Sequence, residues 1–432
     1  MDWKEDYRRK CVTAEEAVTH IKSGDRIIFS HAAGEALPIT DALVANKEAY
    51  RNVEIVHYIA KGKAEYCRPE NARYFHHNTF CAATQTREAV NGPRGDYTPG
   101  FFFETPKLFD TTLKLDVAIF QASRPDKHGF MSLGISVDYA KAAIKKAKTV
   151  IIEANAQCPR SLGNCFFHVS DVDYIVETNR PLIEEPPTKI TDIERTIGEN
   201  CASLIDDGST LQLGIGAIPD SVLLFLDNKK DLGLHSEMLS DSIVPLVEKG
   251  VLTGKKKGIN EKLMVCTFAM GTRRLYDFMD DNPGIFMAPI DYVNDPRIIC
   301  QNHKMVSING CMQVDFFGQV CSETIGPKQW SGIGGQVDFV RGANMCPDGK
   351  AIIATRSTAR GGTISKIVPF LDHGAAVTTS RNDVNYVVTE YGIAQLKGKT
   401  LKQRSRELIN IAHPKFRDWL IDEFERLYQT KF

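Results

Sequence analysis

The sequence lacks the features that mark several common classes of protein. Among its 432 residues, no apolar run reaches the ~18 residues that a membrane span requires. The first residues, MDWKEDYRRKC, are charged and contain no apolar signal core. The chain has 53 basic and 54 acidic side chains and no basic run of the kind that binds nucleic acid. We therefore expect a cytoplasmic protein that binds neither nucleic acid nor membranes.

The sequence also has no recognisable metal site or disulfide framework. Its 11 cysteines are scattered without a C-x-x-C pair, which argues against a zinc framework. Most are expected to be reduced and to pack as small apolar side chains. The adjacent pair His76 and His77 has no H-E-x-x-H pattern around it. We therefore expect no bound metal.

Composition and periodicity indicate a globular α/β protein. Apolar residues make up 43% and charged residues 25% of the chain, close to globular averages. Its length exceeds one ordinary core, so two domains of roughly 200 residues each are expected. Short β-branched runs alternate with helical patterns, which is typical of β-α-β units with mainly parallel strands. The clearest strand-like runs are residues 25–31, 53–60, 114–123 and 149–155.

A proline-rich interval divides the chain. The stretch TNRPLIEEPPTK, residues 178–189, contains three prolines flanked by charged residues, so it continues neither a strand nor a helix. We place the domain boundary there. The prediction is an N-terminal α/β domain over residues 1–185 and a C-terminal α/β domain over residues 186–432.

The pattern of the first half returns in the second. Residues 23–46 contain a glycine, a strand, a small-residue turn, a proline and a helix, and residues 207–228 repeat this order. Residues 114–132 are echoed by residues 304–322, with Gly129 and Gly318 in equivalent positions. The offsets agree at about 185 to 190 residues. This agreement predicts two similar, open, mainly parallel α/β domains that arose by internal duplication.

One glycine-rich turn is a candidate ligand site. The stretch LGIGAIPDS, residues 213–221, follows an apparent strand and leads into a helix that we expect to begin at Pro219. Ligands of open α/β sheets bind beyond the carboxyl ends of the strands, and two glycines let the backbone approach a ligand closely. The turn has neither the third glycine of a dinucleotide fingerprint nor the Lys-Ser/Thr pair of a phosphate-binding loop. An empty β-α turn and an anion-binding turn are therefore equal alternatives.

Two further clusters of small residues lie downstream. WSGIGGQVDFVRGA, residues 330–343, has three glycines in four positions before a strand-like VDFV. TRSTARGG, residues 355–362, combines hydroxyl groups with Arg356 and Arg360. Each alone is a loop. Together with the turn at residues 213–221, they suit a large phosphorylated ligand.

A single acid stands in an unusual setting. GLHSEMLSDS, residues 233–242, places Glu237 among small and polar residues before a helix-like run over residues 242–249. A carboxylate is a weak nucleophile in water but a competent one when it is desolvated and oriented. The alternative is a solvated acid at a helix start, where it complements the helix dipole. Composition alone favours that alternative.

Taken in order, these motifs resemble the acetyl-CoA hydrolase/transferase family, the class I CoA-transferases that include 4-hydroxybutyrate and butyrate:acetate CoA-transferases. The matching stretches are SHAAGE (30–35), LGIGAIPDSV, GLHSEMLSD, SINGCMQVDFFGQV, GIGGQVDFVRGA, TARGG and VTEYGIAQLKGKT (388–400). They follow the family's order across nearly the whole chain. The resemblance implies that Glu237 attacks an acyl-CoA thioester and then carries CoA as a glutamyl thioester.

The resemblance also implies roles for other residues. Asn309 and the backbone amide of Gly335 would stabilise oxyanions, and Glu390 would orient the nucleophile or border its pocket. His31 and Gly34 would line the acyl pocket, the alternative being a turn that binds no ligand. From the residues alone, Asn309 is a turn former before Gly310 and Glu390 is a plain acid at a strand end. The implied CoA contacts are Gly214, Ile215, Gly216, Ala217, Ile218, Ser331, Gly335 and Arg360.

The leading prediction is a CoA-transferase that exchanges CoA between a short-chain acyl-CoA and a free carboxylate such as acetate. The acyl group would be 4-hydroxybutyryl, butyryl or acetyl, and no cofactor would be permanently bound. The alternative within the family is an acyl-CoA hydrolase, and the alternative from another class is a non-catalytic nucleotide- or CoA-binding regulator. The amphipathic segments LKQRSRELINIA and FRDWLIDEFERLY suggest a homo-oligomer, most simply a dimer.

Overall fold

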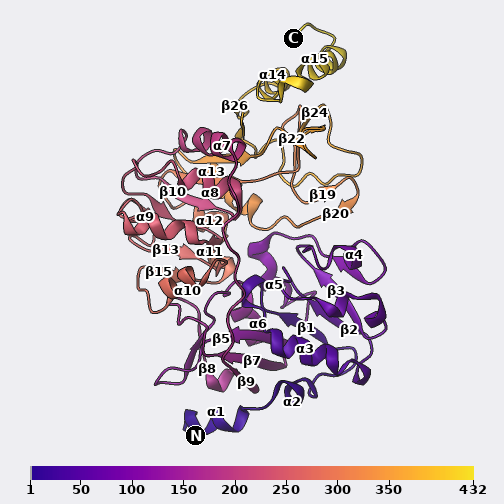
Figure 1. Ribbon diagram of the computed structural model, residues 1–432, viewed down its shortest axis with the longest axis vertical. Helices are drawn as coiled ribbons and strands as arrows, with labels where there is room; N and C mark the ends of the chain where they lie inside the picture. The colour runs from indigo at the N-terminus through magenta and orange to yellow at the C-terminus, as the bar shows by residue number, and fades with distance from the viewer. Residues whose placement is uncertain (1) are drawn as a thin grey trace. The chain divides into compact units, whose positions relative to one another are not determined.

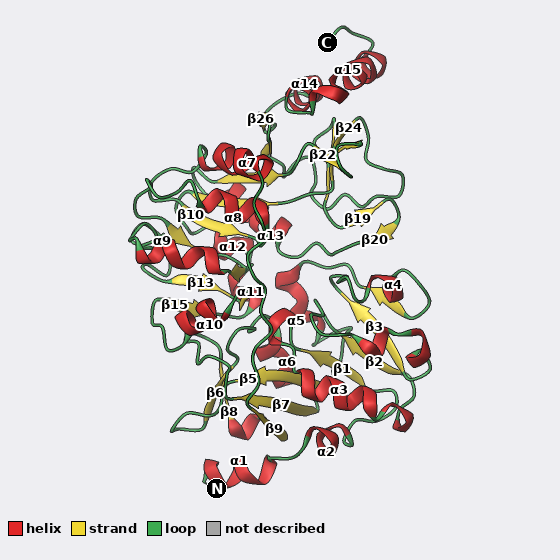
Figure 2. Ribbon diagram, in the orientation of Figure 1, coloured by secondary structure: helices red, strands yellow, loops and turns green. Residues whose placement is uncertain are grey.

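The computed structural model describes residues 2–432 and consists of two compact units (Figure 1). The first unit contains the chain up to Pro186 together with Met238–Asp241 and Val265–Val293, and the second contains Pro187–Glu237, Ser242–Met264 and Asn294–Phe432. Each unit has one large, mainly parallel sheet accompanied by helices (Figure 2). The predicted α/β class is therefore confirmed.

The first unit is built on a seven-stranded parallel sheet in the order β4-β3-β2-β1-β5-β7-β9. The strands are β1 (Arg26–Phe29), β2 (Val53–Val56), β3 (Phe75–Thr79), β4 (Gly95–Tyr97), β5 (Val117–Ala122), β7 (Thr149–Asn155) and β9 (Tyr174–Thr178). Every residue of β5 is buried, as expected for a parallel strand covered on both faces. The four strand-like runs noted in the sequence are thus confirmed as strands.

Shorter elements complete the first unit. The helices are α1 (Trp3–Lys10), α2 (Ala14–Val18), α3 (Leu37–Ala45), α4 (Arg87–Val90), α5 (Thr105–Leu108), α6 (Ala140–Lys146), α10 (Arg273–Met279) and α11 (Ile290–Val293). The short strands pair as β6 (Phe130–Ser132) with β8 (Phe166–His168), β12 (Met238–Leu239) with β14 (Phe268–Ala269), and β13 (Met264–Cys266) with β15 (Ile285–Met287).

The second unit is built on a six-stranded sheet in the order β11-β10-β16-β21-β25-β26, in which only the last pair is antiparallel. The strands are β10 (Thr210–Leu213), β11 (Gly233–Leu234), β16 (Met305–Asn309), β21 (Lys350–Ala354), β25 (Tyr386–Thr389) and β26 (Gly392–Gln395). The helices are α7 (Asp192–Ala202), α8 (Ala217–Leu223), α9 (Val244–Glu248), α12 (Pro296–Ile299), α13 (Gln336–Met345), α14 (Leu401–Asn410) and α15 (Pro414–Tyr428). Short strands are β17 (Gln313–Asp315), β18 (Val320–Cys321), β19 (Thr324–Ile325), β20 (Lys328–Gln329), β22 (Thr358–Ala359), β23 (Ile364–Ser365) and β24 (Ile367–Val368).

The two large sheets share part of their strand order. In the first, β2 lies beside β1 on one side, with β3 and β4 beyond it, and β5, β7 and β9 follow on the other; in the second, β11 lies beside β10 on one side, and β16, β21 and β25 follow on the other. The two echoed turns also match in detail. Gly129 and Gly318 have φ values of 86° and 84°, which glycine adopts without strain. Asp126 and Asp315 each accept hydrogen bonds from the amides two and four residues further on. These likenesses fit an internal duplication, which stays a prediction.

Two sequence predictions in the second unit need correction. The stretch VDFV is part of helix α13 and is not a strand. A short apolar run cannot distinguish a strand from a helix buried on most of its faces, and residues 336–340, 342 and 343 of α13 are all buried. Helix α8 begins at Ala217 and not at Pro219, because the chain already turns into the helix after Gly216.

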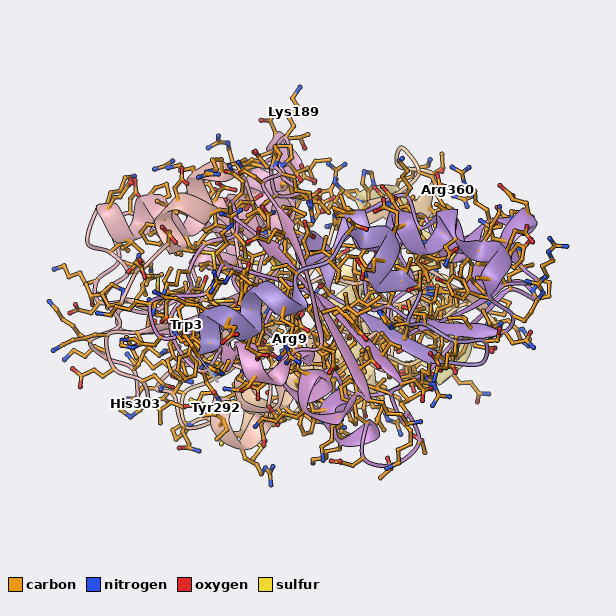
Figure 3. The ribbon with its side chains drawn as sticks, turned by 90° about the horizontal axis from the view of Figure 1, so that it is seen from below. Trp3, Arg9, Lys189, Tyr292, His303 and Arg360 are labelled. Carbon is orange, nitrogen blue, oxygen red and sulfur yellow. The ribbon has the colours of Figure 1, made fainter. Side chains whose placement is uncertain are left out.

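The proline-rich interval lacks regular secondary structure, as its composition predicts. Within the described chain, residues 179–191 form neither helix nor strand. The side chain of Lys189 in this interval is exposed and points outward (Figure 3). Elsewhere, no helix among residues 2–432 is long and apolar enough to cross a membrane.

The core of the first unit contains two buried neutral histidines. His57 Nδ1 lies 2.7 Å from Tyr66 Oη, and His77 Nδ1 lies 3.2 Å from the carbonyl oxygen of Ile55. Burial lowers the pKa of His57 well below its ordinary value, and it lowers the pKa of His77 to about 4. Both side chains are therefore uncharged in the folded protein at neutral pH.

We expect this protein to lose stability in mild acid. The unfolded chain binds protons at these histidines below about pH 6.5, whereas the folded chain does not until near pH 4 for His77. The contribution of the neutral histidines to the free energy of unfolding is therefore fully present above pH 6.5. As the pH falls below 6.5, the free energy of unfolding decreases by about 1.4 kcal/mol per pH unit for each histidine that stays neutral in the folded state. Denaturant titrations between pH 7 and pH 5 measure the slope.

Variants at neighbouring residues separate this effect from other titrations. His77→Gln is expected to flatten the slope. His76→Gln is the matched control, because the His76 side chain is 42% exposed and pairs with Asp96 at the surface. Equal slopes in the wild type and both variants would contradict the assignment.

Candidate active site

The loop that carries Glu237 is fixed by backbone and side-chain hydrogen bonds. Strand β11 ends at Leu234, and the amide of His235 still donates to the Leu211 carbonyl oxygen at 3.0 Å. Ser236 Oγ donates to the Leu213 carbonyl oxygen at 3.0 Å. The buried ammonium group of Lys257 donates to the carbonyl oxygens of Leu234 and Leu263, both at 2.8 Å. The chain is therefore held in place immediately before Glu237.

The Glu237 carboxylate lies in a close contact with two distant parts of the chain. Asn294 Nδ2 donates to Glu237 Oε2 at 2.7 Å. Gly335, the residue before α13, leaves room for both groups: an added Cβ there would lie 2.0 Å from Glu237 Oε2 and 2.3 Å from Asn294 Nδ2. Glu237 itself is partly buried. Any side chain at position 335 would thus displace the carboxylate.

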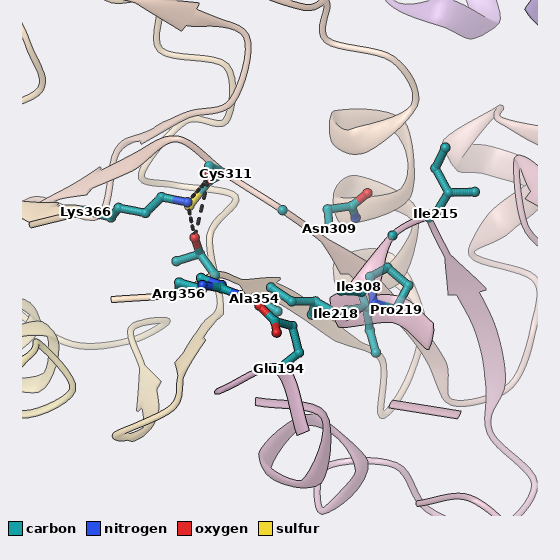
Figure 4. Close-up of a pocket in the computed structure, with 15 residues that line it drawn as sticks. Glu194, Ile215, Ile218, Pro219, Ile308, Asn309, Cys311, Ala354, Arg356 and Lys366 are labelled. Carbon is teal, nitrogen blue, oxygen red and sulfur yellow. Dashed lines mark hydrogen bonds and ion pairs between the residues drawn. The ribbon is translucent and has the colours of Figure 1, made fainter. Parts of the chain in front are cut away.

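A cavity of about 390 Å³ opens at the carboxyl ends of β10, β16 and β21 (Figure 4). This is the edge at which open α/β sheets bind ligands. Gly216 has a φ of 112°, which strongly favours glycine at this turn. The lining residues are Glu194, Gly214, Ile215, Gly216, Ala217, Ile218, Pro219, Ile308, Asn309, Gly310, Cys311, Ala354, Thr355, Arg356 and Lys366.

Two cations line this cavity, and one of them is neutralised. Arg356 Nε forms an ion pair with Glu194. Burial raises the pKa of Glu194, but hydrogen bonds from Arg356 and Thr191 outweigh it, so the net shift is downward and the carboxylate stays charged. Lys366 Nζ donates to the Cys311 carbonyl oxygen at 2.6 Å and to Thr355 Oγ1. Within residues 2–432 Lys366 makes no ion pair, so its charge is available to an anion.

The predicted CoA contacts divide into two groups. Gly214, Ile215, Gly216, Ala217 and Ile218 all line the cavity. Among the described residues, Ser331, Gly335 and Arg360 are not part of that lining. The amide of Ser331 donates to the Glu323 carbonyl oxygen at 3.0 Å. Arg360 has a φ of 47° in the turn between β22 and β23, and its exposed side chain lies at the surface (Figure 3).

The two other predicted catalytic side chains have clear partners. Asn309, at the end of β16, lines the cavity, and its Nδ2 donates to Gln212 Oε1 at 3.1 Å. Glu390 accepts hydrogen bonds from the amide and the hydroxyl group of Ser357, at 2.9 and 2.6 Å. Glu390 therefore orders the loop that carries Arg356.

His31 and Gly34 belong to the first unit. The His31 side chain is 1% exposed, and its Nδ1 lies 3.5 Å from Asp138 Oδ2. An added Cβ at Gly34 would lie 2.6 Å from the Cβ of Ser136, so this position also requires a glycine. Aromatic rings surround His31, namely those of Tyr58, Phe102, Tyr139 and Phe268. A role of both residues in an acyl pocket stays a prediction.

Comparison with known proteins decides the family. The sequence matches the models of the Acetyl-CoA hydrolase/transferase N-terminal domain over residues 1–184 and of the Acetyl-CoA hydrolase/transferase C-terminal domain over residues 271–424. The chain belongs to the acetyl-CoA hydrolase/transferase family. The resemblance found in the sequence motifs is thereby confirmed.

Individual relatives of this family cover the chain almost completely. The chain is 57% identical, over 99% of its length, to the whole 4-hydroxybutyrate coenzyme A transferase of Clostridium kluyveri. It is 44% identical to the succinyl-CoA:cyclohexane-1-carboxylate CoA transferase of Geobacter metallireducens, over 98% of this chain and 97% of that protein. The solved structure of a 4-hydroxybutyrate CoA-transferase from Porphyromonas gingivalis superposes with a TM-score of 0.86 at 40% identity, covering 99% of this chain and 100% of that one.

For this member of the acetyl-CoA hydrolase/transferase family, sequence reasoning missed three residues near the candidate site. No sequence pattern points to a functional role for Asn294 or Lys366. Asn294 lies in an Asn-Asp-Pro segment that is typical of a turn, and Lys366 is an isolated lysine. Asp338 lies in the stretch that was interpreted as a strand. Recognising α13 as a helix that begins after Gly335 would have directed attention to its first turn.

Proposed function

We propose that this protein exchanges CoA between a short-chain acyl-CoA and a free carboxylate such as acetate, through a glutamyl-CoA thioester on Glu237. The chain is an enzyme that transfers CoA, because relatives that match nearly its whole length at 57% and 44% identity are CoA transferases. The more similar of the two favours 4-hydroxybutyryl-CoA as a substrate. The observation that carries the mechanism is the close contact of the Glu237 carboxylate with Asn294 and Gly335.

In the first step, one oxygen of the Glu237 carboxylate attacks the carbonyl carbon of the acyl-CoA thioester. A C–O bond forms, the C–S bond breaks, and CoA leaves as a thiolate. The product is a mixed anhydride between the acyl group and Glu237. A thiolate is a good leaving group, and the hydrogen bond from Asn294 orients the carboxylate for this attack.

In the second step, the CoA thiolate attacks Cδ of Glu237. The Cδ–S bond forms, the bond from Cδ to the bridging oxygen breaks, and the original acyl group leaves as a free carboxylate. The glutamyl-CoA thioester retains the activation of the substrate. A second carboxylate then reverses both steps, so that a new acyl-CoA is released and Glu237 is restored.

The cavity at the carboxyl ends of β10, β16 and β21 is the proposed site for part of CoA. Its glycine-rich turn, residues 214–218, allows close approach of the backbone to a ligand. Lys366 supplies a positive charge, whereas that of Arg356 is balanced by Glu194. This arrangement supports binding of an anionic substrate such as CoA.

Mass spectrometry of the intact protein tests the proposal. After incubation with 4-hydroxybutyryl-CoA and no acceptor acid, we expect the mass to rise by that of CoA less one water. A thioester with CoA can form only on a carboxyl group. Under the proposed mechanism, peptide mapping should place the adduct on Glu237. Glu248→Gln, which removes an exposed acid on α9, is the matched control and should still form the adduct.

Dependence on an acceptor separates the alternatives. Turnover that requires added acetate supports the transferase. Release of CoA at the same rate without any acid would identify an acyl-CoA hydrolase. Binding of CoA with neither adduct nor turnover would identify the non-catalytic regulator and would refute the proposed mechanism.

A further inference from the structure

We propose that the second unit holds an anion-binding site, separate from the candidate active site, for a small molecule that carries a phosphate or diphosphate group. The site is a second cavity of about 390 Å³, and every residue that lines it belongs to that unit. Its charged and titratable lining residues are Lys230, Lys256, Lys304, His303, Asp207 and Asp231. None of them takes part in the proposed glutamyl-CoA reaction.

This cavity lies at the amino ends of three neighbouring strands. Residues 207–208 precede β10, residues 230–231 precede β11, and residues 303–304 precede β16. The three strands are parallel and adjacent in the sheet. The candidate active-site cavity opens at the carboxyl ends of β10 and β16. The two cavities therefore lie at opposite edges of one sheet, and the second is not part of the site proposed for CoA.

Contacts between the loops fix the walls of this cavity. The amide of Gly208, whose φ is 75°, donates to the Lys230 carbonyl oxygen at 2.8 Å. The amide of Thr210 donates to the Lys304 carbonyl oxygen at 3.3 Å. An added Cβ at Gly208 would lie 3.3 Å from the Cβ of Lys256, so the stem of this lysine lies beside the same turn. All three lysines thus project from segments of fixed position.

The lysines of this cavity are not neutralised by acids. Lys304 Nζ donates to the Asp207 carbonyl oxygen at 3.3 Å, a contact that leaves its charge uncompensated. The neighbouring acid Asp206 is already paired with Lys350 at 2.8 Å. Within residues 2–432, none of the three lysines in the lining forms an ion pair. Their charges are therefore available to an anion.

The two acids in the lining have structural partners. Asp207 Oδ1 accepts a hydrogen bond from the amide of Lys230 at 2.8 Å, and Asp231 Oδ1 accepts one from Thr253 Oγ1 at 2.9 Å. Each acid thereby secures a turn at the rim of the cavity. The lining has three ammonium groups and two carboxylates, so its net charge is positive, whereas that of the whole chain is −1. A concave surface with such a local excess attracts anions.

The backbone of Lys304 has a conformation that lysine rarely adopts. Its φ of 45° lies in the left-handed region, which is unfavourable for a residue with a long side chain. Glycine would adopt this conformation without strain. Strained residues of this kind cluster at sites that bind ligands, where the side chain repays the strain. A ligand-binding role for the half-buried Lys304 side chain accounts for a lysine at this position.

The types of cation favour a phosphate over a carboxylate as the ligand. Lysine binds phosphate as a compact point charge with three donors, whereas arginine suits the planar carboxylate group. Among the described residues, the lining contains lysines and no arginine. Its volume of about 390 Å³ lies in the ~300 to 1,000 Å³ range of small-molecule sites. His303, at the surface, adds a further donor at the rim (Figure 3).

Calorimetric titration of the full chain with inorganic pyrophosphate tests the proposal. We expect Lys256→Gln and Lys304→Gln each to raise Kd by about 10-fold, since each removes one charge-assisted hydrogen bond. The double variant should raise Kd by about 100-fold. Lys366→Gln removes a cation from the candidate active-site cavity and should leave this binding unchanged. Loss of binding in Lys366→Gln, with full binding in the other variants, would place the anion in the active-site cavity and overturn the proposal.

Lys255→Gln is the matched control for the loss of one positive charge. Lys255 is exposed and adjacent to Lys256, but it is not part of the lining. Its substitution should leave Kd unchanged. An equal rise of Kd in Lys255→Gln and Lys256→Gln would reveal unspecific attraction to a basic surface and would refute the site. A wild type that binds no pyrophosphate would refute it as well.

Citrate tests the class of ligand, because it carries three carboxylates and no phosphate. We expect its Kd to exceed that of pyrophosphate by about 10-fold or more. Citrate that binds as tightly as pyrophosphate would contradict the assignment to a phosphate. Glu237→Gln should bind pyrophosphate as the wild type does, so the outcome is independent of the proposed reaction on Glu237.

Discussion

The Glu237→Gln enzyme is expected to exchange CoA on the order of 10⁴- to 10⁶-fold more slowly than the wild type. The substitution keeps the size of the side chain, and a glutamine oxygen still accepts the hydrogen bond from Asn294 that Glu237 Oε2 accepts at 2.7 Å. What is lost is the nucleophile, since a neutral amide neither attacks a thioester nor forms the glutamyl thioester. Steady-state assays with acyl-CoA and acetate measure the loss.

Glu237→Asp provides a second test at the same position. Retracting the carboxylate by about one methylene group spoils the attack geometry, for which a displacement of ~1 Å costs about 100-fold. Thermal unfolding and CoA binding should stay close to those of the wild type in both variants, which excludes misfolding as the cause. Full activity in either one would remove Glu237 from the mechanism.

The Gly335→Ala enzyme is expected to lose about 1,000-fold or more in kcat. A methyl group at this position would lie 2.0 Å from Glu237 Oε2 and 2.3 Å from Asn294 Nδ2, so both groups must move. The displacement misplaces the nucleophile and also separates it from its donor, and the two losses combine. Backbone strain does not contribute, because Gly335 has a φ of −91°, which alanine adopts readily.

The adjacent Gly334 supplies the control for this substitution. An added Cβ at Gly334 meets no atom within 4 Å, although its φ of 53° is unfavourable for alanine. Gly334→Ala should therefore lower the free energy of unfolding by about 1 kcal/mol while kcat stays near that of the wild type. If Gly335→Ala were as active as Gly334→Ala, the steric account of position 335 would be wrong.

Much of the fold could be predicted from the sequence because its signals are local or repeated. The strand-like runs at residues 114–123 and 149–155 correspond to β5 and β7, since buried parallel strands leave continuous apolar segments. The same property misled the interpretation of VDFV, because a helix buried on most faces leaves a similar run. Periodicity decides only where one face of an element meets water.

The candidate site was predictable only in part. Glu237 and the turn at residues 214–218 stood out through their small neighbours and their glycines. Asn294 contacts Glu237 across 57 residues of sequence, and it contacts Asp338 across 44. No local pattern records such a contact, because it depends on where two chain turns meet after folding. The same holds for Lys366, whose position in the cavity follows from the pairing of β24 with β17.

The hydrogen bonds that Lys257 and Ser236 make to the backbone have a consequence for catalysis. They immobilise the residues immediately before Glu237, with an ammonium group buried between two peptide carbonyls. The conformational entropy of ordering the nucleophile is therefore lost once, when the protein folds, and not again in each catalytic cycle. A preorganised carboxylate of this kind needs no loop closure of its own to become reactive.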